Sequence, residues 1–298
     1  MILRKESPVL NLLETCKKHG LIFDGAMGSM LIRSGLVGGG ASESWNLEKP
    51  EVVQSIHQAY FDAGSDIATS NTFGGSRLKL KKAGLDDRCK EINRIAVHLA
   101  KQAAGQKKWV AGDMGPTGEL LFPSGTLTEE AAIDNFAVQA TCLTEAGADL
   151  LIVETMYDLD EALAAVKGIQ RVSSLPLFVT LTFQQTPSGF VTVMGNWLAN
   201  SMKTLADAGV SAVGANCSLG SDTMVILARQ IREAVTIPVI IQPNAGIPKV
   251  HGNETIYPET PEQFADNIVK IKAEGIEIVG GCCGTSPEHI TRICERIR

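Results

Sequence analysis

The sequence predicts an α/β protein made of a single (β/α)8 barrel of the TIM type, spanning residues 1–298. Three observations predict this fold. Short apolar, often β-branched segments recur along the chain, separated by amphipathic stretches with helical spacing. Eight such repeats can be counted, and no linker rich in Pro, Gly or Ser divides them. The length suits one barrel, while a doubly wound open sheet is the structural alternative.

Eight strands are predicted, each a short apolar run that leads into small or polar residues. In chain order they cover residues 21–28, 66–73, 109–116, 150–156, 177–183, 212–218, 239–246 and 277–284. Because the strands alternate with helices, the sheet is expected to be parallel, with every strand pointing the same way.

Helices are predicted wherever apolar residues recur at a spacing of three or four. Three of them are expected to end at Gly64, Gly147 and Gly275, where a left-handed residue would cap the helix. Thr128 and Ser286 precede acidic first turns and are predicted N-caps. The apolar stripes of the three glycine-terminated helices are Val52, Ile56, Ala59 and Ala63; Ile133, Phe136, Ala137, Ala140 and Leu143; and Phe264, Ile268 and Ile271.

Composition excludes several classes of function. Lys and Arg number 27 and Asp and Glu 33, so the formal net charge is −6, and a basic groove for nucleic acid is not expected. The longest apolar runs fall far short of the roughly 20 residues of a membrane span. The opening MILRKESPVL lacks the apolar core of a signal peptide, so we expect a cytoplasmic protein. In that reducing compartment the seven cysteines should be thiols or metal ligands.

The C-terminal ends of the predicted strands are unusually polar or reactive. In a barrel of this kind these ends meet at one mouth, where functional groups collect. The ends are Asp24-Gly25-Ala26-Met27-Gly28, Asn71-Thr72-Phe73, Asp113-Met114-Gly115-Pro116, Glu154-Thr155-Met156, Asn216-Cys217-Ser218, Gln242-Pro243-Asn244 and Cys282-Cys283.

Three of the cysteines lie at strand ends and could form one metal site. Cys282 and Cys283 are adjacent and would point to opposite faces of a regular strand. The glycines around them, such as Gly281 and Gly284, permit the unusual backbone angles that would turn both thiols the same way. With Cys217 they would give three thiolates and an open fourth position, which is typical of a catalytic zinc site.

Other interpretations of the cysteines stay open. For the adjacent pair alone, packing in the core is about as plausible as metal binding, and a strained vicinal disulfide is a third possibility. The remaining cysteines are expected to be small buried hydrophobic residues in helices: Cys16, Cys89, Cys142 and Cys294.

Asp24 and Glu154 form a second group of candidate residues. Either carboxylate could cap the helix that follows its strand. The small residues after Asp24 would also let the backbone approach a ligand and present N–H groups to it. Two carboxylates suggest an amine, and backbone N–H groups suggest a carboxylate. Together they describe an amino acid.

These stretches resemble the homocysteine S-methyltransferase family, which includes the homocysteine-binding module of cobalamin-dependent methionine synthase and betaine–homocysteine methyltransferase. The resemblance extends over nearly the whole chain. The matching stretches are DGAMGSML (24–31), PEVVQSIHQAYFDAGSDIATSNTFGGS (50–76), GDMGPTGE (112–119), LIVETM (151–156), GANCSLG (214–220), QPNAGIP (242–248) and GGCCGTSPEHI (280–290).

The resemblance implies a role for each matching residue. Cys217, Cys282 and Cys283 would bind Zn²⁺ and serve catalysis. Asp24 and Glu154 would hold the homocysteine amino group, the backbone from Gly25 to Met27 would receive its carboxylate, and Asn244 would supply a metal ligand when substrate is absent. The candidate substrate-binding residues are thus Asp24, Gly25, Ala26, Met27, Glu154, Asn216 and Asn244.

The implied activity is zinc-dependent transfer of a methyl group to homocysteine, giving methionine. The chain contains no Asp-x-His-x-x-Gly stretch to ligate a corrinoid, so it is not expected to carry the donor itself. The expected donor, given the resemblance, is a methylated corrinoid protein that docks at the mouth. S-methylmethionine, S-adenosylmethionine or betaine is the alternative donor, and a different thiol acceptor is also open.

Two rival classes are a zinc hydrolase and a metal-binding barrel without catalysis. The five histidines, none at a strand end, disfavour the hydrolase, because hydrolytic zinc prefers His and carboxylate ligands.

Overall fold

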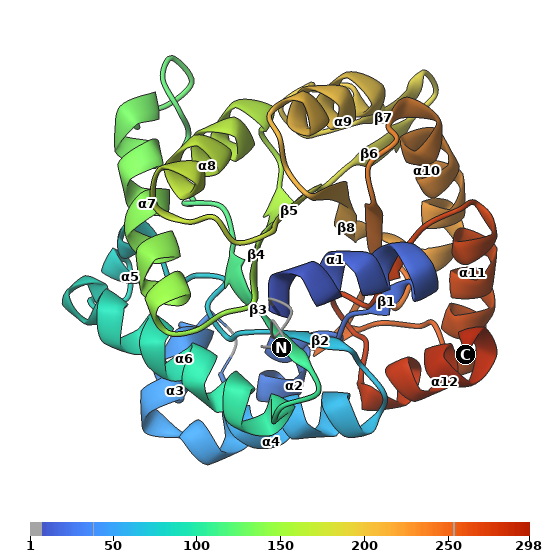
Figure 1. Cartoon of the computed structure of the whole chain (residues 1–298), viewed down its shortest axis with the longest axis horizontal. Coiled ribbons are helices and arrows are strands. Elements are labelled where there is room, and N and C mark those ends of the chain that lie inside the picture. The colour runs from blue at the N-terminus through green and yellow to red at the C-terminus, as the bar shows by residue number, and fades with distance from the viewer. Residues whose placement is uncertain (1–7, 38, 253) are drawn as a thin grey trace, which may run out of the picture.

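The computed structural model describes residues 8–37, 39–252 and 254–298, and it shows strands and helices alternating around a barrel (Figure 1). A strand forms in each of the eight predicted segments, but several are shorter than predicted, above all the first, second and last. The strands are β1 (Leu21–Ile22), β2 (Ile67–Thr69), β3 (Trp109–Met114), β4 (Leu150–Met156), β5 (Leu177–Leu181), β8 (Ala212–Gly220), β9 (Val239–Asn244) and β12 (Ile278–Val279). Part of the MILRKESPVL stretch, residues 1–7, lies outside the described residues.

The strands form one parallel sheet that closes on itself. Their order is β1-β12-β9-β8-β5-β4-β3-β2. The two outer strands meet through a parallel bridge between Phe23 and Ile67, and the Asp66 N–H donates to the Ile22 carbonyl over 2.7 Å. The predicted closed barrel is confirmed, and the doubly wound open sheet is not what forms.

One main helix follows each strand and covers the outside of the sheet (Figure 1). The described helices include short ones beside the mouth: α2 (Met27–Arg33), α3 (Trp45–Glu48) and α5 (Arg77–Lys81), with 3-10 turns at Ser42–Ser44 and Asp86–Arg88. The main helices are α4 (Pro50–Asp62), α6 (Cys89–Ala104), α7 (Glu129–Glu145), α8 (Leu159–Val172), α9 (Leu198–Asp207), α10 (Ser221–Ala234), α11 (Pro261–Ala273) and α12 (Pro287–Ile297).

The predicted helix ends are confirmed. Helices α4, α7 and α11 stop just before Gly64, Gly147 and Gly275, whose φ angles are 110°, 93° and 84°. These left-handed angles favour glycine because a side chain there would be strained. At the start of α7, the Thr128 hydroxyl accepts a hydrogen bond from the Ala131 N–H at 3.3 Å. Ser286 precedes α12, as expected.

Successive residues of each strand pack on opposite sides of the barrel wall. In β4, Leu150 and Ile152 join the apolar cluster inside the barrel, whereas Leu151 and Val153 pack in the cluster formed with the helices. The same alternation turns Glu154 inward. At the opposite end of the barrel, helix α1 (Pro8–His19) inserts its Leu12 side chain into the interior cluster.

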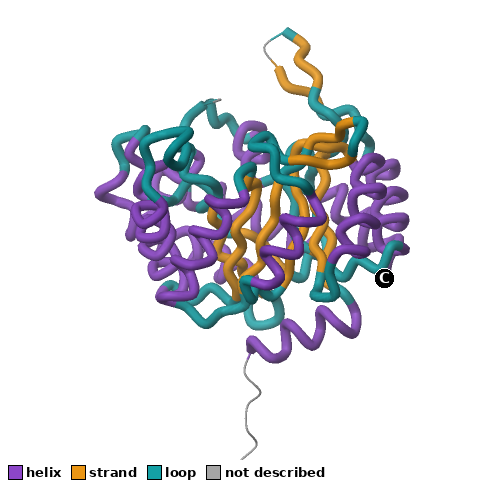
Figure 2. Tube along the Cα trace, turned by 90° about the horizontal axis from the view of Figure 1, so that it is seen from above, coloured by secondary structure: helices purple, strands orange, loops and turns teal. Residues whose placement is uncertain are grey.

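Two hairpins are inserted in the loops of the mouth, and the sequence pattern did not predict them. They pair β6 (Gln184–Thr186) with β7 (Gly189–Val191), and β10 (Lys249–His251) with β11 (Glu254–Ile256). Figure 2 shows the second hairpin projecting beyond the end of the barrel. Among the described residues, no helix is both long and apolar enough to span a bilayer.

His57 makes the stability of the barrel depend on pH. Its imidazole is fully buried on α4, and neither ring nitrogen has a hydrogen-bond partner among the described residues. Burial lowers the pKa of His57 from 6.5 to about 4. The unfolded chain therefore takes up one more proton than the folded chain between these two values, and the free energy of unfolding should fall by roughly 3 kcal/mol as the pH drops through them.

The variant His57→Leu is expected to remove this pH dependence, because the apolar side chain suits the buried position and leaves no hydrogen bond unmade. Urea unfolding at pH 7 and pH 4 measures the difference between wild type and variant. His98→Gln, which removes an exposed imidazole from α6, is the matched control. An equal loss of stability in wild type and His57→Leu would contradict the prediction.

Candidate functional site

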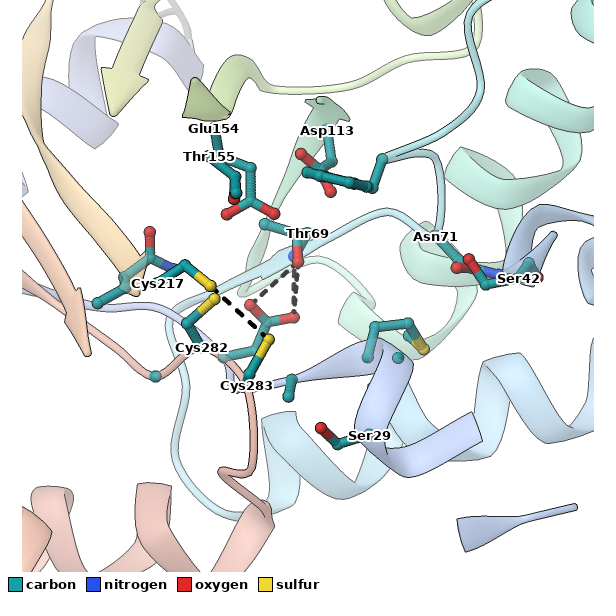
Figure 3. Close-up of a pocket in the computed structure, with 18 of the residues that line it drawn as sticks. Ser29, Ser42, Thr69, Asn71, Asp113, Glu154, Thr155, Cys217, Cys282 and Cys283 are labelled. Atoms are coloured by element: carbon teal, nitrogen blue, oxygen red, sulfur yellow. Dashed lines mark hydrogen bonds between the residues drawn. The ribbon is translucent and has the colours of Figure 1, made fainter. Parts of the chain in front are cut away.

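The predicted strand ends converge on one cavity at the C-terminal mouth. Its volume is about 220 Å³, and its wall includes three thiols and three carboxyl groups (Figure 3). The thiols come from Cys217, Cys282 and Cys283, and the carboxyls from Asp24, Asp113 and Glu154. No lysine or arginine is among the described residues that line it.

The three thiols are close enough to share one metal ion. Their sulfur atoms all lie within 4.8 Å of one another, and Cys217 Sγ is 3.9 Å from Cys283 Sγ. Tetrahedral zinc with Zn–S bonds of about 2.3 Å separates its sulfurs by roughly 3.8 Å, so the residues fit zinc. All seven cysteines, which lie in the described ranges, are free, so the vicinal disulfide is not formed.

The thiol cluster also favours a thiolate, which is the form that binds metal. Hydrogen bonds from the thiols of Cys217 and Cys282 lower the pKa of Cys283 to about 3. The same contacts, with burial, raise the pKa of Cys282 well above its usual range. Cys283 is thus the thiol that ionises most easily, and Cys217 and Cys282 would lose their protons on binding a metal, whose ligands are thiolates.

Backbone geometry brings these thiols together in a way that differs from the prediction. Strand β12 ends at Val279, so Cys282 and Cys283 lie in the turn after it, not at its terminus. The Cys282 N–H donates to the Pro243 carbonyl at 2.7 Å. Cys217 itself has a φ of 59°, a strained value for a residue with a side chain.

Thr285 connects the turn that carries Cys282 and Cys283 to the loop after β1 through two hydrogen bonds. Its hydroxyl donates to the Cys282 carbonyl at 2.7 Å and accepts from the Ala26 N–H at 3.1 Å. A Cβ at Gly25 would lie 2.6 Å from that hydroxyl, so glycine is needed there for close packing. The N–H groups of Met27 and Gly28, in the first turn of α2, have no acceptor within the helix.

Asp24 is held by β2 and does not cap a helix. Its side chain is buried, and Oδ2 accepts a hydrogen bond from the Thr69 N–H at 2.9 Å (Figure 3). Helix α2 begins at Met27 and has no side-chain cap. Burial raises the pKa of Asp24 well above its usual range, hydrogen bonds from Thr69 oppose this shift, and the charge of Glu154 adds to it.

Asn216 lies outside the cavity and holds the Glu154 carboxylate by a hydrogen bond. Its amide donates to Glu154 Oε2 and to Thr155 Oγ1, both at 2.8 Å, and its Oδ1 accepts from the Thr155 N–H and the Thr180 hydroxyl. Asn216 is fully buried and is not among the residues lining the cavity. The structure thus places this predicted substrate-binding residue against Glu154, while Glu154 itself reaches the cavity.

Burial of these acidic groups creates a demand for positive charge. Burial raises the pKa of Glu154 to about 7, and the neighbouring Cys217 adds to the shift. The pKa of Asp113 is raised well above its usual range by burial and by the charges of Glu154 and Asp24. Because no cationic side chain lines the cavity among the described residues, these acids are either protonated or balanced by a bound cation.

The remaining predicted residues lie at different distances from the cavity. Gly25, Ala26 and Met27 line it, as expected. Asn244 is buried at the end of β9 with Oδ1 unpartnered among the described residues, and Gln242 of the same strand reaches the wall instead. The ligand role of Asn244 stays a prediction.

Asp113 and Tyr257 are site residues to which sequence reasoning gave no role. Asp113 stands at a predicted strand end, which was the available signal. Tyr257 follows the β10–β11 hairpin, and its ring packs where a Cβ of Gly284 would lie. Its hydroxyl forms a hydrogen bond with Cys283 that contributes to the low pKa of that thiol. Nothing in the local sequence indicated this contact.

Comparisons with known proteins identify the family of the chain. Residues 21–297 match the family model described as Homocysteine S-methyltransferase. The methionine synthases of Mycobacterium leprae and Mycobacterium tuberculosis are each 31% identical to the chain, over 305 and 306 residues. Each alignment covers 96% of this chain and 25% of the relative, so the chain spans about a quarter of the length of these synthases.

Solved structures show the same fold. The homocysteine methyltransferase MmuM from Escherichia coli, in its metallated form, matches with a TM-score of 0.80 and 23% identity, covering 97% of this chain and 100% of that one. Its oxidized form matches with a TM-score of 0.80 and 24% identity, covering 98% and 100%. With the family match extending from the first barrel strand into the last helix, the chain belongs to the homocysteine S-methyltransferase family.

Proposed function

We propose that this protein is a zinc-dependent thiol methyltransferase that transfers a methyl group to homocysteine, giving methionine. The observation that carries the proposal is the convergence of three thiols and a carboxyl cluster on one small cavity. The thiols suit a metal that binds sulfur, and the carboxyls suit the ammonium group of an amino acid. A hydrolytic metal site would offer His and carboxylate ligands instead.

Cys217, Cys282 and Cys283 would hold the zinc ion. When bound, zinc supplies the Lewis acidity that keeps a substrate thiol ionised at neutral pH. Two hydrogen bonds support this arrangement: the Thr285 hydroxyl donates to the Cys282 carbonyl, and Asn216, the neighbour of Cys217, accepts from the Thr155 N–H.

The cavity also offers partners for the two charged ends of an amino acid. Asp24 and Glu154 would accept hydrogen bonds from the ammonium group. The N–H groups of Met27 and Gly28 at the start of α2 would receive the carboxylate, because Ala26 N–H already donates to Thr285. In the reaction, a sulfur–carbon bond forms as the donor–methyl bond breaks, the donor keeps the bonding electrons, and the thiol proton is lost.

We infer that the methyl donor is a methylated corrinoid carried on a partner protein or domain and not bound by this chain. The loops of the mouth carry exposed apolar side chains, which favours a protein surface as partner. Examples are Phe122, Val193, Trp197, Ile247 and Val250. A small donor such as S-methylmethionine, S-adenosylmethionine or betaine would not need exposed apolar residues around the mouth. We place the reaction in the cytoplasm, since free thiols suit a reducing compartment.

The proposal is tested by offering the zinc-loaded protein homocysteine with methylcobalamin, and separately with each of the three small donors. Methionine formation from methylcobalamin is the expected result. A barrel that only binds metal would retain zinc and form no methionine with any donor, which would overturn the proposal.

A triple variant, Phe122→Ser, Val193→Ser and Val250→Ser, tests whether the exposed apolar residues of the mouth loops bind the partner protein. We expect the KM for a methylated cobalamin-binding module to rise about tenfold or more, because apolar anchors dominate such interfaces. The rate with free methylcobalamin should be unchanged. Ile226→Ser, which alters an exposed apolar residue on the outer helix α10, is the control. Equal effects on both donors would contradict docking.

A further inference from the structure

Asp113 is the third acidic side chain of the cavity, and neither the thiol site nor the amino-acid contacts proposed above use it. It lies near the C-terminal end of β3, on the inward side shared with Ala111 of the interior cluster. Only 4% of its surface is exposed, yet it lines the same cavity as Asp24 and Glu154 (Figure 3).

The surrounding chain fixes the backbone of Asp113, and its carboxyl shares a hydrogen bond with Glu154 but keeps one oxygen without a partner within the described ranges. The Asp113 N–H donates to the Ser70 hydroxyl at 3.2 Å, and its carbonyl accepts from the Thr72 hydroxyl at 2.7 Å. Its Oδ1 atom is buried and has no hydrogen-bond partner among the described residues. A buried acceptor of this kind is costly unless something completes it.

The charges that face Asp113 are all negative. Burial raises the pKa of Asp113 most, and the charges of Glu154, Asp24 and Glu43 and the hydrogen bond with Glu154 raise it further. Gathering these acids without a cationic side chain in the wall would be unfavourable if the cavity stayed without a compensating positive charge. The missing charge must therefore come from a proton or from a ligand.

An α-ammonium group fits this demand better than other cations. It is compact and offers three N–H donors, like the ammonium of lysine. The cavity offers three carboxyl groups, and one of them, Asp113, has an oxygen with no other partner. A guanidinium is planar and larger, and it would need space that the small cavity also has to give to the substrate thiol.

We propose that Asp113 binds the α-ammonium group of the thiol substrate directly, together with Asp24 and Glu154, and that it thereby selects amino-acid thiols over thiols without an amine. This inference rests on the proposed function, because it assumes that an amino acid occupies the cavity. It adds Asp113 to Asp24 and Glu154 as a third carboxyl that contacts the substrate ammonium, and it explains how the site would prefer thiols that carry an amine.

The test compares L-homocysteine with 4-mercaptobutanoate, which is the same molecule without the amino group. Calorimetry on the zinc-loaded protein gives both dissociation constants, and their ratio measures the preference for the amine without any methyl transfer. We expect Asp113→Asn to lower this preference by about tenfold to a hundredfold, as for loss of a charge-assisted hydrogen bond. Zinc content should stay at one per chain.

Two further variants guard against an indirect effect on folding or charge. Asp113→Ser should lower the preference in the same way, with a smaller side chain. Glu161→Gln removes another buried carboxylate, which accepts from the Thr117 N–H and hydroxyl at 2.7 Å outside the cavity, and it should leave the preference unchanged. An unchanged preference in both Asp113 variants would overturn the inference.

A direct contact is distinguished from a positioning role by adding Glu154→Gln. If Asp113 touches the ammonium, Asp113→Asn should still lower the preference in the Glu154→Gln protein. If it only positions Glu154, the second change would have no further effect, which would overturn direct binding. A wild-type protein without any preference for homocysteine would instead overturn the proposed function, and the Asp113 inference with it.

Discussion

Replacing Cys217, Cys282 or Cys283 by alanine is expected to remove stoichiometric zinc and to abolish methyl transfer. Structural zinc sites in peptides bind with about 10–16 kcal/mol over four ligands, so one thiolate contributes roughly 3 kcal/mol, or more than a hundredfold in affinity. The three sulfurs lie within 4.8 Å of one another, so no single thiol is peripheral to the site. Metal analysis after dialysis and a methylcobalamin assay would measure the two losses.

Cys142→Ala is the matched control for these variants. Cys142 is buried on α7, is free, and does not line the cavity. Its loss should cost about 1 kcal/mol of stability through the small space left behind, with zinc content and activity retained. Full zinc content in all three variants of the cluster would show that the metal, if bound, is held elsewhere.

The fold was largely predictable because its signals are local. Apolar runs such as that of β4, and glycines such as Gly64 and Gly147, fix strands and helix ends within a few residues of themselves. The meeting of strand ends at one mouth then follows from barrel topology, and Asp24 and Glu154 line one cavity there.

The parts that could not be predicted depend on contacts between distant segments. The sequence predicts a substrate-binding role for Asn216, whereas its side-chain amide donates to Glu154 and Thr155 of another strand, a contact that no local pattern indicates. Asp113 lies in a wall that contains no lysine or arginine among the described residues, and this follows only from the contacts between several distant loops. The β10–β11 hairpin interrupts the barrel repeat, so the period of alternating strands and helices gave no sign of it.

Asp24→Asn and Glu154→Gln are each expected to raise the KM for homocysteine by about one to two orders of magnitude. Each change keeps the shape of the side chain but removes a charge facing the substrate ammonium, a contact worth roughly 1.5–3 kcal/mol. The local hydrogen bonds can persist, because an amide oxygen still accepts from the Thr69 N–H or from Asn216. Zinc content should therefore stay at one per chain.

Asp160→Asn, which removes an exposed charge at the start of α8, is the control for both variants and should leave the KM unchanged. A structural role must be distinguished from a substrate-binding role, because Asp24 and Glu154 are both buried and could stabilise the fold alone. A purely structural role predicts lower stability and partial zinc loss at an unaltered KM. A substrate role predicts the opposite pattern, with stability and metal retained and only the affinity for homocysteine reduced, since the lost charge faces the cavity that the amino acid enters.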